Sequence, residues 1–139
     1  AALLIADGTR SDEPYEHIVI DLRVDDHSEP LKELERLLSI QRAYEHMNKG
    51  DEFLAKNEIN SAMKEYTIGA NLAPNIEELP FWQAVSMAAN GYLKEALPIF
   101  HSVFSKNRDW AEMLKRLPAA DLFPKDEEML KRILQELTN

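Results

Sequence analysis

The chain has 139 residues with 45% hydrophobic side chains, which suits one globular domain with an ordinary core. It contains no cysteine, which excludes disulfide bonds and thiolate metal sites. The formal net charge is −9, and residues 1–30 hold eight acidic residues against two arginines. Because phosphate backbones require a basic surface, this charge argues against nucleic acid as a partner. No apolar run approaches the ~18 residues of a membrane span and no signal-peptide pattern is present, so we expect a cytoplasmic protein without membrane contact.

The segment 1–27 differs from the remainder of the chain in its apolar pattern. Short runs rich in Ile, Val and Leu occupy positions 1–6 and 17–24, and a segment rich in Gly, Asp, Ser and Pro separates them. This pattern predicts two strands joined as a β-hairpin. Because two strands alone are only marginally stable in water, we expect residues 1–27 to be the terminal strands of a larger sheet domain that this chain lacks.

A helix is expected to follow this hairpin and to run into the central part of the chain. Ser28 supplies an oxygen-bearing cap candidate, and Pro30 suits the first turn of a helix. Apolar residues then recur at helical spacing, and no helix breaker occurs before Gly50. Within a helix Gly50 costs about 1 kcal/mol relative to Ala, a cost that a close approach of two helices offsets.

Two copies of one pattern, 34 positions apart, occupy the middle of the chain. In the first copy, about residues 43–76, five positions follow the spacing of a tetratricopeptide repeat: Gly50, Phe53, Ala62, Tyr66 and Pro74. The second copy, about residues 77–110, keeps that register with Ala84, Met87, Ala96 and Phe100. Asn57 and Gly91 fall at the turn within each copy. Small residues let antiparallel helices approach and large ones fill the gaps, so the pattern predicts two helical hairpins.

Two positions depart from the repeat, and the pattern weakens after the second copy. Pro80 stands where a Trp is expected and confines the start of its helix, because the residue before a proline resists the helical region. Arg108 replaces the closing Pro. The sequence then predicts helices over residues 58–72, 81–89, 93–104 and 109–117, the last one capped by Asp109.

Residues 111–139 are expected to cap the array. Residues 117–124 form an apolar connector that contains two prolines, and Asp126 opens a last helix. The apolar residues of this helix share one face: Met129, Leu130, Ile133, Leu134 and Leu137. A solenoid needs such an end, since each repeat buries only part of its apolar surface against its neighbour. The predicted fold is therefore mainly α, a tetratricopeptide-like α-α superhelix over residues 28–139, with an N-terminal β-hairpin remnant and a C-terminal capping helix.

Two stretches carry a resemblance to a known family. From DLRVDDHSEPLKELERLL at residues 21–38 to WAEMLKRLPAADLFP at residues 110–124, the chain resembles an uncharacterised Ntn-hydrolase-like family of bacteria and archaea. In that family a hydrolase-like sandwich precedes a C-terminal helical domain named as peptidoglycan-binding. The resemblance covers essentially the whole chain. It implies that residues 1–27 close the hydrolase-like domain and that residues 28–139 form the C-terminal domain, although a repeat fold hosts many functions.

No catalytic machinery is visible in the sequence. An Ntn hydrolase requires an N-terminal Thr, Ser or Cys, whereas this chain begins with Ala1 and Ala2, so the nucleophile of the family would lie upstream. The chain has no Gly-x-Ser-x-Gly elbow, phosphate-binding glycine loop or His-Glu-x-x-His pair. Asp25, Asp26 and His27 are the densest polar group, but metal sites draw ligands from several elements, so a strand-to-helix junction is favoured. We expect no enzyme activity, cofactor or metal in this chain.

Binding is the better prospect, because the first helix of each repeat lines the concave face of such an array. Seven residues of the first helices are expected on one largely apolar surface: Tyr44, Met47, Asp51, Leu54, Phe81, Trp82 and Val85. The surface lacks the Lys and Asn clamp by which some tetratricopeptide domains hold a terminal carboxylate. An exposed apolar groove marks an interaction site, although the connector or the final helix of the same chain is equally suited to fill it.

The sequence thus favours a non-catalytic docking module that binds a protein or peptide, either its own hydrolase-like domain or a second copy of the chain. Two alternatives stay open. A peptidoglycan-binding module would hold muropeptides with Phe81 and Trp82, flanked by Glu77 and Glu78, because carbohydrate sites expose aromatic residues beside acids or amides. In the other alternative the parent protein is an amidohydrolase, and this domain selects its substrate.

Overall fold

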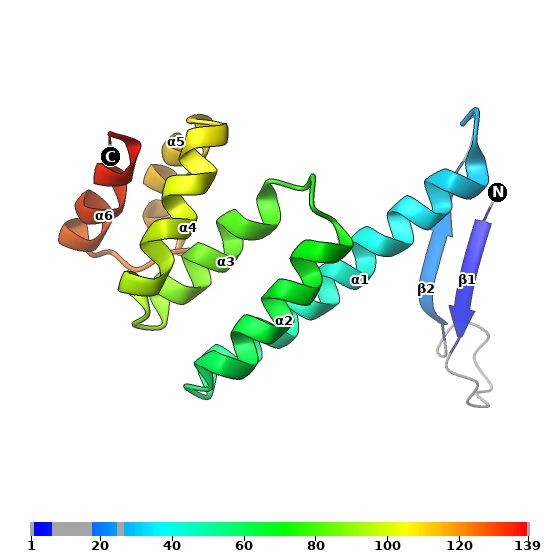
Figure 1. Cartoon of the computed structure of the whole chain (residues 1–139), viewed down its shortest axis with the longest axis horizontal. Helices are drawn as coiled ribbons and strands as arrows, with labels where there is room; N and C mark the ends of the chain where they lie inside the picture. Colours follow the sequence, from blue (N-terminus) through cyan, green and yellow to red (C-terminus); the bar gives the residue numbers. More distant parts are fainter. Residues whose placement is uncertain (1, 7–17, 25–26, 139) are drawn as a thin grey trace. The chain divides into compact units, whose positions relative to one another are not determined.

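The computed structural model describes residues 2–6, 18–24 and 27–138 (Figure 1). The chain divides into two compact units, Ala1–Arg42 and Ala43–Asn139. The division falls inside one long helix, α1 (Pro30–Ala55), whereas the sequence suggested a boundary before that helix.

The N-terminal unit contains a two-stranded antiparallel sheet and the first part of α1. Strand β1 (Ala2–Ala6) pairs with β2 (Ile18–Arg23), with Ala2 opposite Arg23 and an irregularity after Ile5. The two strands lie where the alternating apolar runs predicted them. That they close a larger sheet domain stays a prediction.

The second unit is helical, and its elements follow one another as hairpins. After the end of α1 come α2 (Ile59–Leu72), α3 (Glu78–Ala89), α4 (Leu93–Lys106) and α5 (Asp109–Arg116). The chain closes with the short 3-10 turn η1 (Pro118–Ala120), helix α6 (Glu127–Leu134) and the 3-10 turn η2 (Gln135–Leu137). The mainly α-helical character expected from the sequence is confirmed.

The first two hairpins of this unit repeat each other at a constant interval along the chain. Helices α1 and α3 end at Ala55 and Ala89, and helices α2 and α4 begin at Ile59 and Leu93, so both pairs of boundaries differ by 34 positions. The ends of α2 and α4 differ by the same number.

The turns inside the two hairpins are also equivalent. Asn57 (φ 60°) and Gly91 (φ 92°) both adopt a left-handed backbone, which Gly and Asn tolerate best. After each of them, one amide donates a 2.9 Å hydrogen bond to the carbonyl five positions earlier: Glu58 to Phe53, and Tyr92 to Met87. The repeat pattern of the sequence therefore corresponds to two copies of one backbone structure.

The register continues beyond the point where the sequence pattern weakens. Helix α6 begins at Glu127, again 34 positions after Leu93, and Asp126 caps it by accepting a 3.0 Å hydrogen bond from the amide of Met129. The partner helix α5 is short, and η1 with an extended connector replaces its second half. The start of α6 therefore keeps the 34-position interval, while α5 is shorter than the corresponding helices α1 and α3.

Two expectations about helix starts were wrong. Asp109 is the first residue of α5 and does not cap it; the Oδ1 atom of Asn107 accepts a 3.0 Å hydrogen bond from the Asp109 amide instead. Helix α3 begins at Glu78, before Pro80 rather than after it. A proline is tolerated there because the first-turn amides of a helix have no partner within the helix.

Small residues bring the paired helices together, as the repeat pattern predicted. Ala62, Ala84 and Ala96 have no exposed surface. A Cβ atom added at Gly50 would lie 2.7 Å from Cδ1 and 2.8 Å from Cζ of Tyr66, so only glycine leaves room for this ring. Tyr66 is itself buried, and its ring fills the space between α1 and α2.

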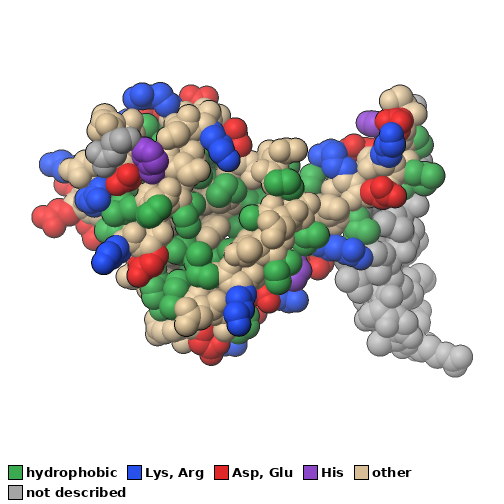
Figure 2. Space-filling view, in the orientation of Figure 1, with side chains coloured by type: hydrophobic (Ala, Val, Ile, Leu, Met, Phe, Trp, Pro, Cys, Tyr) green, Lys and Arg blue, Asp and Glu red, His purple; other side chains and the backbone are tan. Residues whose placement is uncertain are grey.

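The last helical elements cover one side of α4. Ile133 is fully buried, and His101 of α4 lies with its Nδ1 atom 3.2 Å from the carbonyl oxygen of Glu136. The Glu136 carboxylate, which is also buried, accepts a 2.9 Å hydrogen bond from Arg132. On the face of this unit seen in Figure 2, charged side chains lie mainly toward the edges and apolar side chains toward the middle.

Candidate functional site

A narrow groove runs between α1 and α3, the first helices of the two repeated hairpins. It encloses about 180 Å³ and is lined by four residues from each helix: Tyr44, Met47, Asn48 and Asp51 from α1, and Leu79, Trp82, Gln83 and Ser86 from α3. Both sets follow the i, i+3, i+4, i+7 spacing of one helix face. We call this feature the α1–α3 groove.

Four of the seven residues predicted for a binding surface lie in this groove: Tyr44, Met47, Asp51 and Trp82. The other three are core residues and do not line it. Leu54 and Phe81 have 0% exposed surface, and Val85 has 4%. These three residues were selected because they are apolar, but Phe81 and Val85 of α3 and Leu54 of α1 pack inward.

The groove contains four residues that the sequence analysis did not select: Asn48, Leu79, Gln83 and Ser86. Asn48 and Ser86 lie one helical turn from predicted residues of the same helix, Tyr44 and Trp82 respectively. A signal was present, because Gln83 and Ser86 are the polar interruptions of an otherwise apolar run along α3.

A carboxylate holds the aromatic rim of the groove in place. Glu78 accepts one hydrogen bond from the hydroxyl of Tyr44 (3.0 Å) and another from Nε1 of Trp82 (3.1 Å), one on each of its oxygens. Burial raises the pKa of the Tyr44 phenol, and the hydrogen bond to Glu78 raises it further. Tyr44 therefore stays a neutral donor that points at Glu78.

Phe81 supports this rim from the core side. Its ring stacks on Trp110 of α5 with the centroids 4.7 Å apart and an interplanar angle of 28°, and it meets Trp82 edge-on at 5.3 Å. Trp110 is fixed in turn by a 3.1 Å hydrogen bond from its Nε1 to Glu77. Phe81 therefore packs between Trp82 and Trp110, and because it has no exposed surface it cannot contact a ligand directly.

A second carboxylate, that of the exposed Asp51, lines the wall of the groove. Asp51 accepts a 2.6 Å hydrogen bond from the hydroxyl of the buried Tyr66. Burial of the phenol is the main cause that raises the pKa of Tyr66, and the hydrogen bond to Asp51 adds to it. The Tyr66 hydroxyl thus occupies one oxygen of Asp51, and the side chain of Asp51 also lines the groove.

Gln83 is the most deeply buried polar side chain of the groove, with 9% of its surface exposed. Its Nε2 atom lies 3.8 Å from the sulfur of Met87 and 4.0 Å from the sulfur of Met63, and thioethers are weak acceptors. No described residue donates a hydrogen bond to its Oε1 atom. A buried carboxamide oxygen without a partner costs free energy, so this atom is suited to a ligand that donates a hydrogen bond.

Two histidines outside the groove make local contacts. His27 accepts a 3.0 Å hydrogen bond from the Glu29 amide, which suits a junction before α1, and its neighbours Asp25 and Asp26 lie outside the described residues. His46 pairs with Glu65 at 2.5 Å. Within the part of the chain that the structure describes, no three His, Asp or Glu side chains gather where a metal ion would bind. Over the same residues, no helix is both long and apolar enough to cross a membrane.

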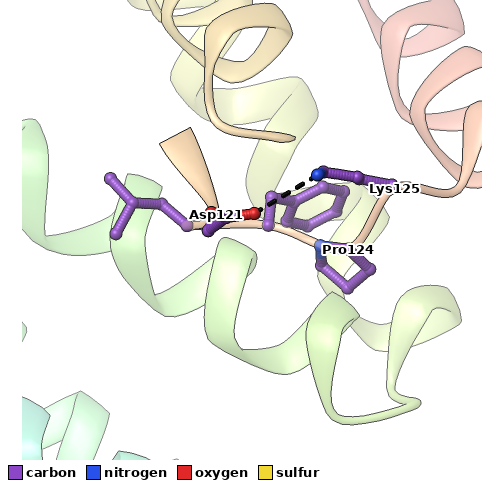
Figure 3. A pocket seen from close by; sticks show the side chains of 5 residues that line it. Asp121, Pro124 and Lys125 are labelled. Carbon is purple, nitrogen blue, oxygen red and sulfur yellow. Dashed lines mark ion pairs between the residues drawn. The ribbon is translucent and has the colours of Figure 1, made fainter. Parts of the chain in front are cut away.

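The connector and the final helix do not fill the α1–α3 groove. The connector surrounds a separate, open hollow of about 530 Å³, lined by Asp121 through Lys125. In Figure 3 the side chains of Asp121 and Lys125 point toward one another beside Pro124, and their charged atoms are 3.4 Å apart. Helix α6 and η2 contact α4 instead. Among the described residues, only α1 and α3 line the groove.

Comparison with known proteins adds no relative. The chain matches no protein-family model, and no curated protein and no solved structure is significantly similar to it.

Proposed function

We propose that residues 43–139 form a tetratricopeptide-like docking module without catalytic function, which binds an extended segment of another protein in the α1–α3 groove. The assignment to the tetratricopeptide class rests on helix ends and turn geometry that recur every 34 positions. In such arrays the first helices line the binding face, and α1 and α3 hold these positions.

The observation that carries the proposal is the rigid, partly polar lining of the groove. Tyr44 and Trp82 are fixed by hydrogen bonds to Glu78, and Phe81 packs behind Trp82. Interfaces favour such pre-organised aromatic residues, because little side-chain entropy is lost on binding. The lining also leaves the acceptor of Gln83 unused.

The size of the groove favours a protein side chain over a cofactor. Small-molecule sites generally enclose roughly 300–1,000 Å³. The α1–α3 groove encloses about 180 Å³, which is enough for one large side chain inserted from a segment that lies along the surface. The natural occupant in this proposal is a segment of a partner protein, the adjoining hydrolase-like domain or a second copy of the chain.

Muropeptide binding is the second candidate, and one observation favours it. Trp82 is half-exposed beside Glu78, which is the aromatic-plus-acid arrangement of many carbohydrate sites. Phe81, which the sequence suggested as a partner of Trp82 in that role, is buried. The candidate therefore depends on one aromatic face, and we rank it below protein docking. A substrate-selecting role for an amidohydrolase would use the same groove.

Selection of peptides against the full chain tests the docking proposal. Random heptapeptides displayed on phage are enriched on the immobilised protein, and the selected sequences are synthesised and titrated against ¹⁵N-labelled chain. The protein has only two tryptophans, so its two indole N–H signals report the site directly. Binding in the groove should change the chemical shift of the Trp82 indole signal more than that of the Trp110 indole signal.

A pair of Ser→Arg variants supplies the control. Ser86→Arg fills the groove, whereas Ser102→Arg places the same side chain on an exposed position of α4. The proposal expects Ser86→Arg to abolish binding and Ser102→Arg to leave it unchanged. Peptides that bind both variants equally, or a selection that enriches none, refute docking in the groove. The second candidate is tested by titrating soluble muropeptide in the same way. If muropeptide binds in the groove, it should bind the Ser102→Arg variant and not the Ser86→Arg variant.

A further inference from the structure

The α1–α3 groove has two aromatic donors that are already used and two acceptor side chains, Asp51 and Gln83, that keep unused oxygens. Its two aromatic donors, the hydroxyl of Tyr44 and Nε1 of Trp82, are both consumed by Glu78. The acceptors are not consumed. Asp51 receives one hydrogen bond from Tyr66 on Oδ1, and Oε1 of Gln83 receives none from any described residue. A ligand that donates hydrogen bonds would satisfy these two acceptors. Asn48 and Ser86, which also line the groove, can both donate and accept.

The charges around the groove have the same sign. Asp51 lies on its wall, Glu78 holds its rim, and none of its eight lining residues is Lys or Arg. The residues of this unit, 43–139, include fifteen acids against eleven Lys and Arg. A cation is therefore attracted to the groove both locally and by the unit as a whole.

The aromatic residues favour a flat cation. Trp82 and Tyr44 both line the groove, and a cation over an aromatic face is stabilised, most strongly over Trp. The guanidinium group of arginine is planar, stacks on aromatic rings and carries five N–H donors. Its donors are spread over a planar fork, which suits a lining that carries more than one acceptor, whereas an ammonium group presents its donors from one point.

From these observations we propose that the α1–α3 groove binds an arginine side chain presented by an extended segment of a partner protein. This rests on the proposed docking function and specifies its partner chemistry. The guanidinium stacks against Trp82, donates to the free oxygen of Asp51 and donates to Oε1 of Gln83. The volume of about 180 Å³ holds this one side chain with few waters.

Four capped heptapeptides test the proposal on the full chain. They share the frame acetyl-Gly-Ser-Ala-X-Ala-Ser-Gly-amide, and X is Arg, citrulline, Lys or Glu. Citrulline is the matched control, since it keeps the shape of arginine and removes the charge. Affinity is followed by the indole signals of Trp82 and Trp110. We expect the Arg peptide to bind at least about 10-fold more tightly than the citrulline peptide, because a charge-assisted hydrogen bond is lost. Lys should rank below Arg, and Glu should not bind.

Charge variants of the protein localise the effect. Asp51→Asn removes the charge and keeps an oxygen that can accept a hydrogen bond from Tyr66. We expect this variant to bind the Arg peptide about 10-fold more weakly than the wild type and to bind the citrulline peptide with nearly unchanged affinity. Asp121→Asn removes the same charge from an exposed, left-handed position that Asn tolerates, and it should change neither affinity. Thermal unfolding of both variants confirms that the fold is kept.

The outcomes separate this inference from the docking function. Equal binding of the Arg and citrulline peptides, or an Asp51→Asn variant that binds Arg as well as the wild type, overturns the arginine assignment. If phage-selected peptides bind the groove but carry no basic residue, docking stands and the arginine assignment fails. If the selected peptides bind elsewhere or none is enriched, both fail.

Discussion

Replacement of Gly50 by alanine tests the packing that the repeat depends on. In an open helix this substitution stabilises by about 1 kcal/mol. Here the new methyl group would lie within 2.8 Å of Cδ1 and Cζ of Tyr66, a buried ring that has little room to move. Overpacking of this kind costs about 1–3 kcal/mol, and displacement of the ring also weakens its hydrogen bond to Asp51 by about 1 kcal/mol. We expect a net destabilisation of about 1–3 kcal/mol.

Urea unfolding followed by far-UV circular dichroism measures this change. A double-mutant cycle isolates its cause, because in a Tyr66→Ala background the obstructing ring is absent. There Gly50→Ala should be neutral or stabilising, so the sign of its effect should reverse. If Gly50→Ala stabilises the wild-type protein, or destabilises both backgrounds equally, the contact with Tyr66 is not the reason for glycine at this position.

Substitutions at three further positions probe the turns, the core and the last helix. Gly91→Ala should destabilise by about 1–2 kcal/mol in urea unfolding, because its φ of 92° is strained for Ala although space is free around it; Gly91→Asn should cost less, since Asn57 holds the equivalent turn. The pKa of Tyr66 is raised above the ordinary 10.0, so its contribution to stability is complete below pH 10 and is lost as the pH rises further; Tyr66→Phe should flatten the alkaline part of a stability–pH profile. Asp126→Ala should cost about 1 kcal/mol of unfolding free energy by removal of the α6 cap, and an unchanged value would contradict the capping bond to Met129.

The repeated hairpins could be predicted because their signals are local and periodic. Gly50, Ala62 and Tyr66 recur one repeat later as Ala84, Ala96 and Phe100, and packing between adjacent helices permits only small or large residues at these points. The helix ends then follow from the same register. The turn residues could be predicted for the same reason, since a left-handed backbone favours Gly and Asn.

The start of α6 continues the 34-position interval, but the repeat pattern could not predict it, because the residue types at the equivalent positions change. Leu130 and Leu134 stand where Ala96 and Phe100 stand in the preceding copy, and Ile133 becomes the buried residue of α6. The buried face of α6 therefore uses different positions of the repeat from the buried face of α4. A search for the residue types of the first two copies therefore does not find α6, although α6 begins 34 positions after α4.

The site could be predicted only in part, for a related reason. Hydrophobicity alone does not distinguish residues that face a groove from those that face the core. Phe81 and Val85 are apolar and buried, whereas the groove uses the neighbouring face with Gln83 and Ser86. That Gln83 meets two methionine sulfurs and lacks a donor to its oxygen depends on long-range packing, which spacing in the sequence does not reveal.

The role of Gln83 gives the most direct test of the central claim, that the α1–α3 groove is a binding site. Gln83→Met replaces the carboxamide with an apolar side chain of similar shape. We expect the free energy of unfolding to be unchanged or raised by up to about 1 kcal/mol, because a buried acceptor without a partner is removed. We also expect the phage-selected peptide to bind about 10-fold more weakly. Gln135→Met, at an exposed position, should change neither. Loss of more than about 1 kcal/mol of stability with full peptide affinity would show that Gln83 serves the fold alone, and would contradict the account.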